Sequence, residues 1–435
     1  MSNYNEDLDR LIICPKCSTL HKKVCIEKGK KAICSHCGKE LYHYDERTLD
    51  HGLALGITGL ILFIVANLFP LVRVDILGHE QHVTIISMVK SLFENGFFVV
   101  GIVVAFMVFI FPLMILLIYI SLSWLMRYRR GEVLTKELLI LLSHLLPWSM
   151  VEIYLVSILV ALVKLIGYMQ IHFGLSFWAL ACFVLLDIYL TKSVHIGELW
   201  ELRYRLYEID TCQVEAGQER TGGIEIEGAD IIRCPVCEAV NFNSKDQIKC
   251  HRCMSTIYKN PTLSTSRAWA FLVTALILYI PANLYPILIS EQFHAQEGNT
   301  IIGGIILLWE EGSYPIALII LVASVLVPIL KFIVLLYLLI STSSINRYKR
   351  SKVNQHKLHY LTEVIGPWSM VDVFVVAVLT GLVQLSTIKV LAGPGATAFV
   401  LMVLFTMFAA LSVDTRLFEE RSDDGSPRNP NDRGE

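Results

Sequence analysis

The chain has 435 residues, of which 54% are apolar and only 17% are charged, and its mean hydropathy is +0.56. Soluble chains carry about 25% charged residues, so this composition argues against a soluble enzyme and predicts a membrane protein. The net charge of −2, from 37 basic and 39 acidic residues, gives no electrostatic basis for binding nucleic acid, which needs a clustered basic face.

Two short polar modules, within residues 1–50 and 228–262, each contain two Cys-x-x-Cys pairs. The segment 18–33 separates the pairs in the first module, and the segment 238–249 separates them in the second. Such a spacing lets four thiolates surround one Zn²⁺ tetrahedrally. Modules this small need the metal for folding energy. The predicted ligands of two structural zinc ions are Cys14, Cys17, Cys34, Cys37, Cys234, Cys237, Cys250 and Cys253.

Two alternatives to zinc follow from the same cysteines. Disulfides are one alternative, but they are disfavoured in the cytoplasm, where the basic loops described below place both modules. A redox pair is the other, but the sequence around each Cys-x-x-Cys lacks the βαβ pattern typical of such pairs. Structural zinc is therefore the favoured interpretation.

Eight segments are apolar over the roughly 20 residues that a membrane-spanning helix needs. None lies in the first 50 residues, so we expect no cleavable signal peptide. Basic loops at 126–137 and 341–358 belong in the cytoplasm by the positive-inside rule, and this places both termini and the long middle segment there too. The predicted spans are 53–72, 97–125, 145–167, 174–192, 268–290, 315–340, 364–386 and 396–413.

The chain contains an internal repeat. The sequence Ala-Asn-Leu-Phe-Pro at residues 66–70 returns as Ala-Asn-Leu-Tyr-Pro at 282–286, an offset of 282 − 66 = 216. The sequence Pro-Trp-Ser-Met-Val-Glu at 147–152 returns as Pro-Trp-Ser-Met-Val-Asp at 367–372, an offset of 367 − 147 = 220. Because each copy holds an even number of spans, the two copies insert in the same orientation. We therefore predict an all-α polytopic membrane protein of two parallel tandem repeats, each a zinc ribbon followed by four membrane helices.

This repeat divides the chain into six segments. A disordered tail is expected at the end because it is rich in Asp, Gly, Pro, Arg and Asn. The predicted segments are zinc ribbon 1 (1–50), transmembrane unit 1 (51–200), a linker (201–227), zinc ribbon 2 (228–262), transmembrane unit 2 (263–418) and the tail (419–435).

Ionisable residues inside spans are candidates for function. Lys331 lies too deep in its span for its side chain to reach either interface, and Asp187 lies at a similar depth in another span. Asp187 aligns with Thr406, and Lys331 with Ile115, so each half contributes one charge. Asp187 is therefore the best candidate for a partner of Lys331 across the two halves, and such a pair would act either as a proton-linked relay or as a purely structural ion pair. The sequence leaves open whether the two side chains touch. The other residues predicted for this polar relay are Thr406, Glu152, Asp372, Ser149 and Ser369.

Two external segments carry apolar residues at helical spacing. The first runs from Thr84, a possible helix cap, to Asn95, and its counterpart runs from Thr300 to Glu311. We expect short interfacial helices there. The chain has no phosphate-binding loop, no Gly-x-Ser-x-Gly elbow and no His-Glu-x-x-His motif, so we expect no enzyme activity of these classes.

The duplicated ribbon, the Asn-Leu-Phe/Tyr-Pro motif and the Pro-Trp-Ser-Met-Val-acid motif resemble the paraquat-inducible protein A family, and within it most closely the lipophilic envelope-spanning tunnel branch. The resemblance covers residues from about 10 to 418. It implies a subunit of the inner membrane of a Gram-negative cell envelope. It also implies phospholipids as cargo and a periplasmic tunnel protein of stacked MCE domains as partner. Two other functions remain open: a scaffold that anchors the tunnel without transporting lipid, and a redox-stress membrane protein that uses its cysteines.

Overall fold

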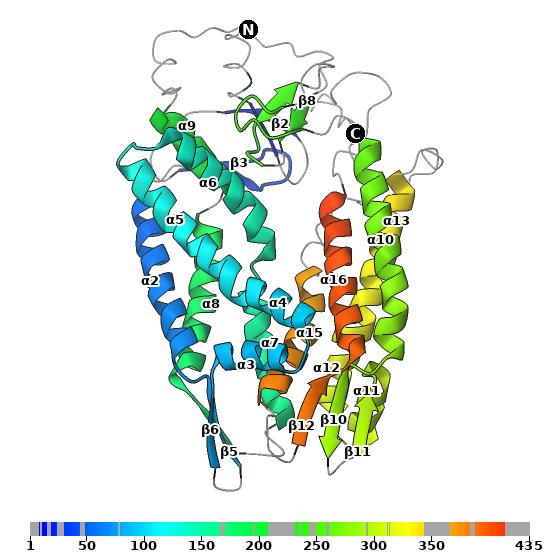
Figure 1. Cartoon of the computed structure of the whole chain (residues 1–435). Coiled ribbons are helices and arrows are strands. Elements are labelled where there is room, and N and C mark those ends of the chain that lie inside the picture. The colour runs from blue at the N-terminus through cyan, green and yellow to red at the C-terminus, as the bar shows by residue number, and fades with distance from the viewer. Residues whose placement is uncertain are drawn as a thin grey trace, which may run out of the picture.

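The computed structural model consists mainly of long helices that run side by side, with small strand hairpins at one end and β-sheets at the other (Figure 1). The part of the chain that the structure describes comprises residues 8, 11–14, 19–23, 30–43, 48–76, 79–165, 170–194, 196–207, 231–234, 236–242, 249–257, 261–292, 295–310, 312, 314–342, 366–382 and 388–413. Several predicted features lie outside these residues: Cys17, most of the linker, the basic loop 341–358 beyond residue 342, and the tail.

Most of the described residues are helical. In chain order the α-helices are α2 (Thr48–Leu68), α3 (Ile85–Glu94), α4 (Phe98–Ala105), α5 (Phe111–Arg127), α6 (Glu132–Leu145), α7 (Val151–Leu165), α8 (Leu175–Ser193), α9 (Ile196–Tyr207), α10 (Pro261–Leu284), α11 (Ile301–Glu310), α12 (Tyr314–Ile320), α13 (Val327–Thr342), α15 (Val371–Leu382) and α16 (Pro394–Ser412). Two π-helical segments, η1 (Phe106–Ile110) and η3 (Leu321–Leu326), join α4 to α5 and α12 to α13. Two 3₁₀ turns, η2 (Leu146–Trp148) and η5 (Gly366–Met370), precede α7 and α15.

Six helical segments in the described part are long and apolar enough to cross a membrane. Two shorter apolar helices lie within two of the other predicted spans, at Ser324–Ile340 and Trp368–Leu382. The six long segments are Leu49–Leu68, Phe98–Arg127, Glu132–Val163, Leu175–Ser193, Thr265–Leu284 and Pro394–Ser412.

Two of the predicted boundaries are wrong for a local reason. The first and fifth spans end at Leu68 and Leu284, before the predicted residues 72 and 290, because a proline follows two positions later and disfavours helix at the residue preceding it. The predicted cytoplasmic loop 126–137 shrinks to a tight turn, since α6 already begins at Glu132. Gly131 adopts a left-handed φ of 70° there, a conformation that glycine adopts without strain.

Two three-stranded sheets at the end away from the cysteine modules correct the all-α expectation (Figure 1). The strand orders are β6-β5-β7 and β11-β10-β12, and all neighbouring strands are antiparallel. Their sequences are short, and β5 (Val-Arg-Val-Asp-Ile) and β7 (Gln-Ile-His-Phe) alternate apolar with polar residues, a period-2 pattern that a search for long apolar runs misses. The strands are β5 (Val72–Ile76), β6 (His79–Val83), β7 (Gln170–Phe173), β10 (Leu288–Gln292), β11 (Ala295–Asn299) and β12 (Ile388–Ala392).

The second membrane half repeats the element order of the first. Strands β5 and β10 begin at an offset of 288 − 72 = 216, and helices α3 and α11 begin at the same offset, 301 − 85 = 216. The π-helical segments fall at equivalent places, shortly before Pro112 and Pro328. A proline in the following turn has no N–H to donate, so the α-helical hydrogen bonding is interrupted there and the chain forms a wider turn.

The helix predicted between Thr84 and Asn95 is confirmed as α3. The Thr84 hydroxyl accepts from the Ser87 amide at 3.1 Å, and the Ser87 hydroxyl accepts from the Thr84 amide at 3.0 Å, which makes a reciprocal capping box. In the second half Thr300 accepts from the Gly303 amide at 3.1 Å and begins α11. A threonine hydroxyl that accepts from the amide three residues on therefore caps both helices, and α3 alone adds the reciprocal bond.

Candidate functional site: two cysteine ribbons and two polar centres in the membrane

The cysteines lie on short hairpins. Strands β1 (Leu11–Ile13) and β2 (Leu20–Lys22), then β3 (Lys31–Ile33) and β4 (Glu40–His43), form the first ribbon, and β8 (Ile231–Arg233) with β9 (Val240–Phe242) belongs to the second. After Cys34, Cys234 and Cys250, the residue four positions on donates its amide to the cysteine carbonyl and has a positive φ. These turns gather the sulfur atoms on one side of each hairpin.

The second ribbon brings all four predicted ligands together. Cys234, Cys237, Cys250 and Cys253 are buried and their sulfur atoms lie within 4.8 Å of one another. The Sγ–Sγ distances are 3.6 Å for Cys234–Cys253 and 3.5 Å for Cys237–Cys250. Four thiolates at about 2.3 Å from a tetrahedral zinc lie about 3.8 Å apart, whereas a disulfide needs about 2.05 Å. The donor set therefore fits zinc and not disulfides.

Polar groups also surround the sulfur atoms of this cluster. Because the four thiols share hydrogen bonds, the pKa of Cys234 is lowered to about 6 and that of Cys250 is lowered, whereas the pKa values of Cys237 and Cys253 are raised. Asn241 donates to the Cys250 sulfur at 3.4 Å, and Ser255 lies 2.7 Å from the Cys253 sulfur. Such outer groups orient the first ligands of a metal site.

The first ribbon brings together the three of its four predicted ligands that the structure describes. Cys14, Cys34 and Cys37 form a second metal-compatible group, with 3.5 Å between the sulfurs of Cys14 and Cys37. His21 Nε2 lies 3.2 Å from the Cys34 sulfur. The fourth predicted ligand, Cys17, falls outside the described residues.

Helix α9 holds both ribbons against the membrane part. Its Glu201 carboxylate lies 2.7 Å from Lys23 Nζ of the first ribbon and 3.8 Å from Arg252 of the second. The Arg252 guanidinium stacks over the Tyr204 ring at 4.8 Å, and Trp200 is fully buried. The predicted linker 201–227 therefore begins inside an ordered helix that sequence reasoning missed, because its apolar face is too short to be read as a span.

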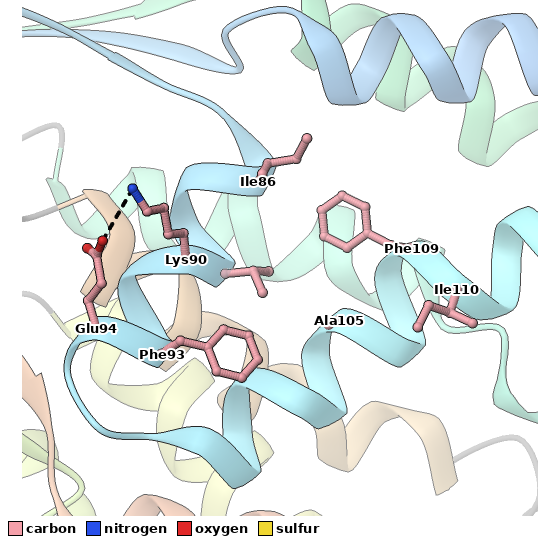
Figure 2. A pocket seen from close by; sticks show the side chains of 8 residues that line it. Ile86, Lys90, Phe93, Glu94, Ala105, Phe109 and Ile110 are labelled. Carbon is pink, nitrogen blue, oxygen red and sulfur yellow. Dashed lines mark ion pairs between the residues drawn. The ribbon is translucent and has the colours of Figure 1, made fainter.

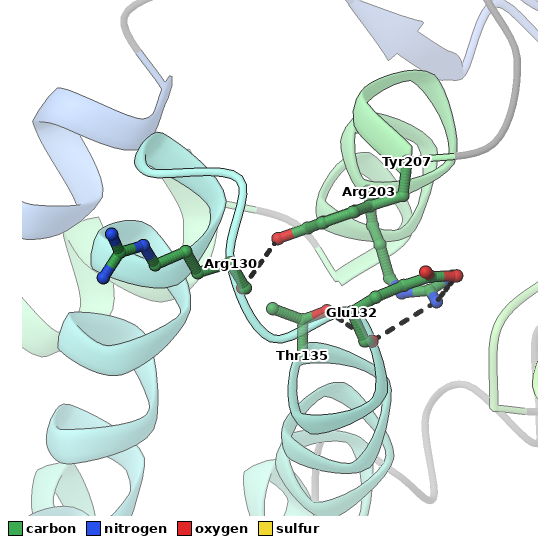
Figure 3. A network of polar contacts seen from close by, with 5 residues as sticks. All are labelled: Arg130, Glu132, Thr135, Arg203 and Tyr207. Carbon is green, nitrogen blue, oxygen red and sulfur yellow. Dashed lines mark hydrogen bonds and ion pairs between the residues drawn. The ribbon is translucent and has the colours of Figure 1, made fainter.

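A polar network joins α9 to the turn between α5 and α6 (Figure 3). The Tyr207 hydroxyl donates to the Arg130 carbonyl at 2.9 Å, and Arg203 lies 3.6 Å from the Glu132 carboxylate. Partial burial raises the pKa of the Tyr207 hydroxyl that donates this hydrogen bond. The ribbons are thus connected through α9 to two membrane helices.

The first polar centre inside the membrane part surrounds Lys331 of α13. This side chain is 3% exposed, and its Nζ lies 3.4 Å from the Ser369 hydroxyl and 3.5 Å from the Gly366 carbonyl. Ser369 itself donates to the Gly366 carbonyl at 2.6 Å. The repeated Pro-Trp-Ser motif therefore supplies the polar partners of the buried lysine.

The second polar centre surrounds Asp187 of α8. Its carboxylate interacts with the hydroxyl of Ser149, the serine of the other Pro-Trp-Ser motif, and with the nearby charge of Glu152. Glu152 is exposed on α7. Each half thus holds one buried or half-buried charge beside the serine of its own motif.

The ion pairs among the described residues do not include the candidate pair Lys331 and Asp187, so these two side chains are not brought together. Equal depth in two helices does not fix the direction in which the side chains point. Thr406 is buried and donates to Val403 of its own helix at 2.7 Å. The side chain of Asp372, the second residue of α15, lies outside the described part.

The two halves meet mainly through α15 of the second half, which packs on α7 and α3 of the first. The Tyr154 and Phe374 rings contact edge to face at 5.5 Å, and Ser157 donates to the Val371 carbonyl at 3.1 Å. Sequence reasoning missed these residues because nothing in their pattern distinguishes an interface between halves from a core.

Six candidate spans, two cysteine clusters that could hold metal ions, and polar centres inside the helical part define a multi-pass membrane protein with cysteine ribbons. The chain belongs to the paraquat-inducible protein A family, whose sequence profile matches it twice, over residues 49–204 and 265–422.

Three curated relatives align with almost the whole chain. The Escherichia coli K12 "Intermembrane transport protein PqiA" is 31% identical, over 94% of this chain and 95% of its own length. The "Lipophilic envelope-spanning tunnel protein A" of the same strain is 28% identical, over 95% and 92%. A "Probable intermembrane transport protein" of Haemophilus influenzae is 25% identical, over 94% and 95%. The identity is higher with the first than with the second, so the expected placement in the tunnel branch gains no support. No solved structure gives a significant match.

Proposed function

We propose that this protein is an inner-membrane subunit that passes phospholipid between the inner membrane and a periplasmic MCE-domain tunnel protein. The supporting observation is the near full-length similarity to proteins named for intermembrane transport and for an envelope-spanning tunnel. These names describe transport proteins and not enzymes. Both membrane halves and the intervening helix α9 fall within the aligned range, so the proposal applies to the chain as a whole.

The proposed architecture is two parallel copies of a ribbon and four spans, with both termini in the cytoplasm. The recurrence of each sheet, external helix and π-helical segment at a near-constant offset supports this duplication, as does the double match of the family profile. The six long helices and two shorter apolar helices fall within the eight predicted spans or overlap them. Two zinc ions would hold the ribbons folded, and α9 would connect them to the membrane helices.

The proposed polar relay consists of two centres, Lys331 with Ser369 and Asp187 with Ser149. Burying an ammonium group without an ionised partner is costly, and the described surroundings of Lys331 offer a hydroxyl and a carbonyl. Such a group loses or gains a proton readily when its surroundings change. Proton exchange at these centres would then bias the packing of α15 against the first half. A purely structural role predicts no such coupling.

The relay is tested by lipid transfer from proteoliposomes that contain Lys331→Met or Asp187→Asn. Each variant removes one charge and keeps the side-chain size, and we expect transfer to fall at least about tenfold. The control is Lys192→Met at the exposed end of α8, which should keep the wild-type rate. Wild-type transfer by both relay variants at matched protein levels would overturn the relay.

The scaffold function has one observation in its favour, the docking of both ribbons on α9 through Glu201. A scaffold should capture no lipid between the two halves. Photo-crosslinkers placed at Phe374 and at Trp148, whose ring contacts Phe408 of the other half at 5.2 Å, distinguish the two functions. Phospholipid adducts at these positions support transport, and their absence supports the scaffold.

A further inference from the structure

An apolar groove lies between external helix α3 and the helix formed by α4 and η1 (Figure 2). Its volume is about 560 Å³, which falls within the roughly 300–1,000 Å³ of typical ligand sites. Figure 2 shows Phe93 of one wall and Phe109 of the other directed toward the space between the two helices, with Lys90 and Glu94 pointing outward from α3. The groove is lined by Ile86, Val89, Lys90, Phe93, Glu94, Ala105, Phe109 and Ile110.

The two charged side chains of this groove are next to each other at its rim. Lys90 Nζ lies 3.3 Å from the Glu94 carboxylate, and both side chains are more than half exposed. The remaining lining is aliphatic or aromatic. A long apolar part of a ligand would therefore fit the groove, and a head that carries a negative and a positive charge would complement the two side chains at the rim.

The position of the groove fits a ligand that comes from the bilayer. Its far wall is the long candidate span Phe98–Arg127, and Ile86 and Ile110 of its lining are 52% and 37% exposed. The opposite face of α3 is held by the second half, where Ser91 donates to the Thr380 carbonyl at 3.3 Å and Met88 packs against Gly381. One wall of the groove is thus anchored at the interface between the halves.

The second half replaces the residues that make this groove. At the repeat offset of the external helices, Ala105 corresponds to the larger Leu321 and Lys90 to Ile306, while Glu94 corresponds to Glu310. The space beside the small side chain of Ala105 and the positive charge of Lys90 next to Glu94 are therefore features of the first half. The repeat itself provides the substitutions that should remove them.

We propose that this groove binds one acyl chain of a zwitterionic phospholipid, with the phosphate of the headgroup facing Lys90 and its ammonium group facing Glu94. The inference rests on the proposed lipid transport, because it assigns a binding site for the transported lipid on the first half. The charge pair selects against an anionic lipid, whose head lacks the ammonium group that Glu94 would meet. The apolar wall accepts the chain without any specific polar contact.

The test uses the purified full chain in nanodiscs with phosphatidylethanolamine that carries a diazirine in one acyl chain, followed by mapping of labelled peptides. We expect labelling within residues 86–110. In Ala105→Leu this labelling should fall about tenfold, the effect of losing the burial of roughly two methylene groups. Ala105→Val, a smaller change, should give a partial loss and serves if the leucine variant does not fold. Leu321→Ala, at the equivalent position of the second half, should leave the labelling unchanged.

The headgroup is tested with a phosphatidylglycerol probe that carries the same diazirine. The wild-type chain should label more strongly with the ethanolamine lipid, and Glu94→Gln should bring the ratio of the two lipids toward one. Equal labelling in the wild type and Ala105→Leu, or no labelling in this segment, would overturn the proposal. Labelling needs no tunnel protein. An unlabelled groove in a chain that transfers lipid normally would therefore refute only the proposal that the groove binds lipid. A labelled groove without transfer would refute only the proposed function.

Discussion

The two membrane halves share one framework and differ in the residues that carry charge. Helices, sheets and π-helical segments recur at a near-constant offset, yet Asp187 stands where the second half has Thr406, and Lys331 stands where the first half has Ile115. The external helices differ as well. The face of α3 that carries Met88 is packed on α15, whereas Leu307 of α11 is 46% exposed. The two halves thus share the order of their elements and differ in the chemistry of individual side chains.

Loss of a zinc ligand should affect the protein more than any change in the membrane halves. Cys250→Ser removes one of four ligands, and binding of structural zinc contributes about 10–16 kcal/mol in small zinc modules. We expect the second ribbon to lose its zinc and the protein level to fall sharply. Zinc content by mass spectrometry, together with the amount of folded protein, measures the effect. Cys182→Ser, at an exposed free thiol, is the control, and a full zinc complement in Cys250→Ser would contradict the tetrahedral site.

The next prediction concerns the different packing of the two external helices, α3 and α11. A Cβ added at Gly381 would lie 2.6 Å from Met88 Cγ, whereas one added at Gly304, the residue equivalent to Met88, would meet nothing within 4 Å. Gly381→Ala should therefore destabilise the interface by about 1–3 kcal/mol. Gly304→Ala should leave stability unchanged or raise it by up to about 1 kcal/mol. Thermal unfolding in detergent compares the two, and equal melting temperatures would argue against the interface.

A smaller effect concerns the attachment of the ribbons. Glu201→Gln removes the carboxylate that meets both Lys23 and Arg252, and because these groups are partly buried the loss should be about 1 kcal/mol or more. Lys31→Met breaks the exposed pair with Glu40, 2.8 Å apart, and should cost well under about 1 kcal/mol. Proteolysis at the ribbons measures both, and equal sensitivity of the two variants would show that Glu201 is not a clamp.

The smallest effect sharpens the comparison of the two caps. Thr84→Ala removes one side of a reciprocal capping box, at a cost of about 1 kcal/mol, whereas Thr300→Ala removes a single hydrogen bond to Gly303. Hydrogen exchange of the first turns of α3 and α11 reports each loss separately. We expect faster exchange in both helices and a larger change in α3, and an unchanged α3 would contradict the capping box.

The sequence predicted what depends on composition and local spacing. Apolar length located the membrane helices, the Cys-x-x-Cys spacing identified residues that meet in space, and Thr84 marked the start of α3. It missed what depends on short or amphipathic elements. The strands of the two sheets are five residues or fewer, and α9 is a polar helix whose partners are distant in the chain.

The Lys331–Asp187 pairing failed for a different physical reason. Depth along a helix follows from residue counting, but the direction of a side chain depends on which helices pack together. Helix α13 packs on α10 and α16, and α8 packs on α2 and α7. Each charge therefore meets the Pro-Trp-Ser serine of its own half. Counting residues from the span ends cannot predict which helices pack together.

The most direct test of the proposed transport measures phospholipid delivered to the purified MCE-domain tunnel protein from vesicles with and without the full chain. Labelled phospholipid should be recovered on the tunnel protein when the chain is present in the vesicles, and only at background level when it is absent. Equal recovery from both kinds of vesicle, with the tunnel protein bound to the chain, would contradict transport and leave a scaffold.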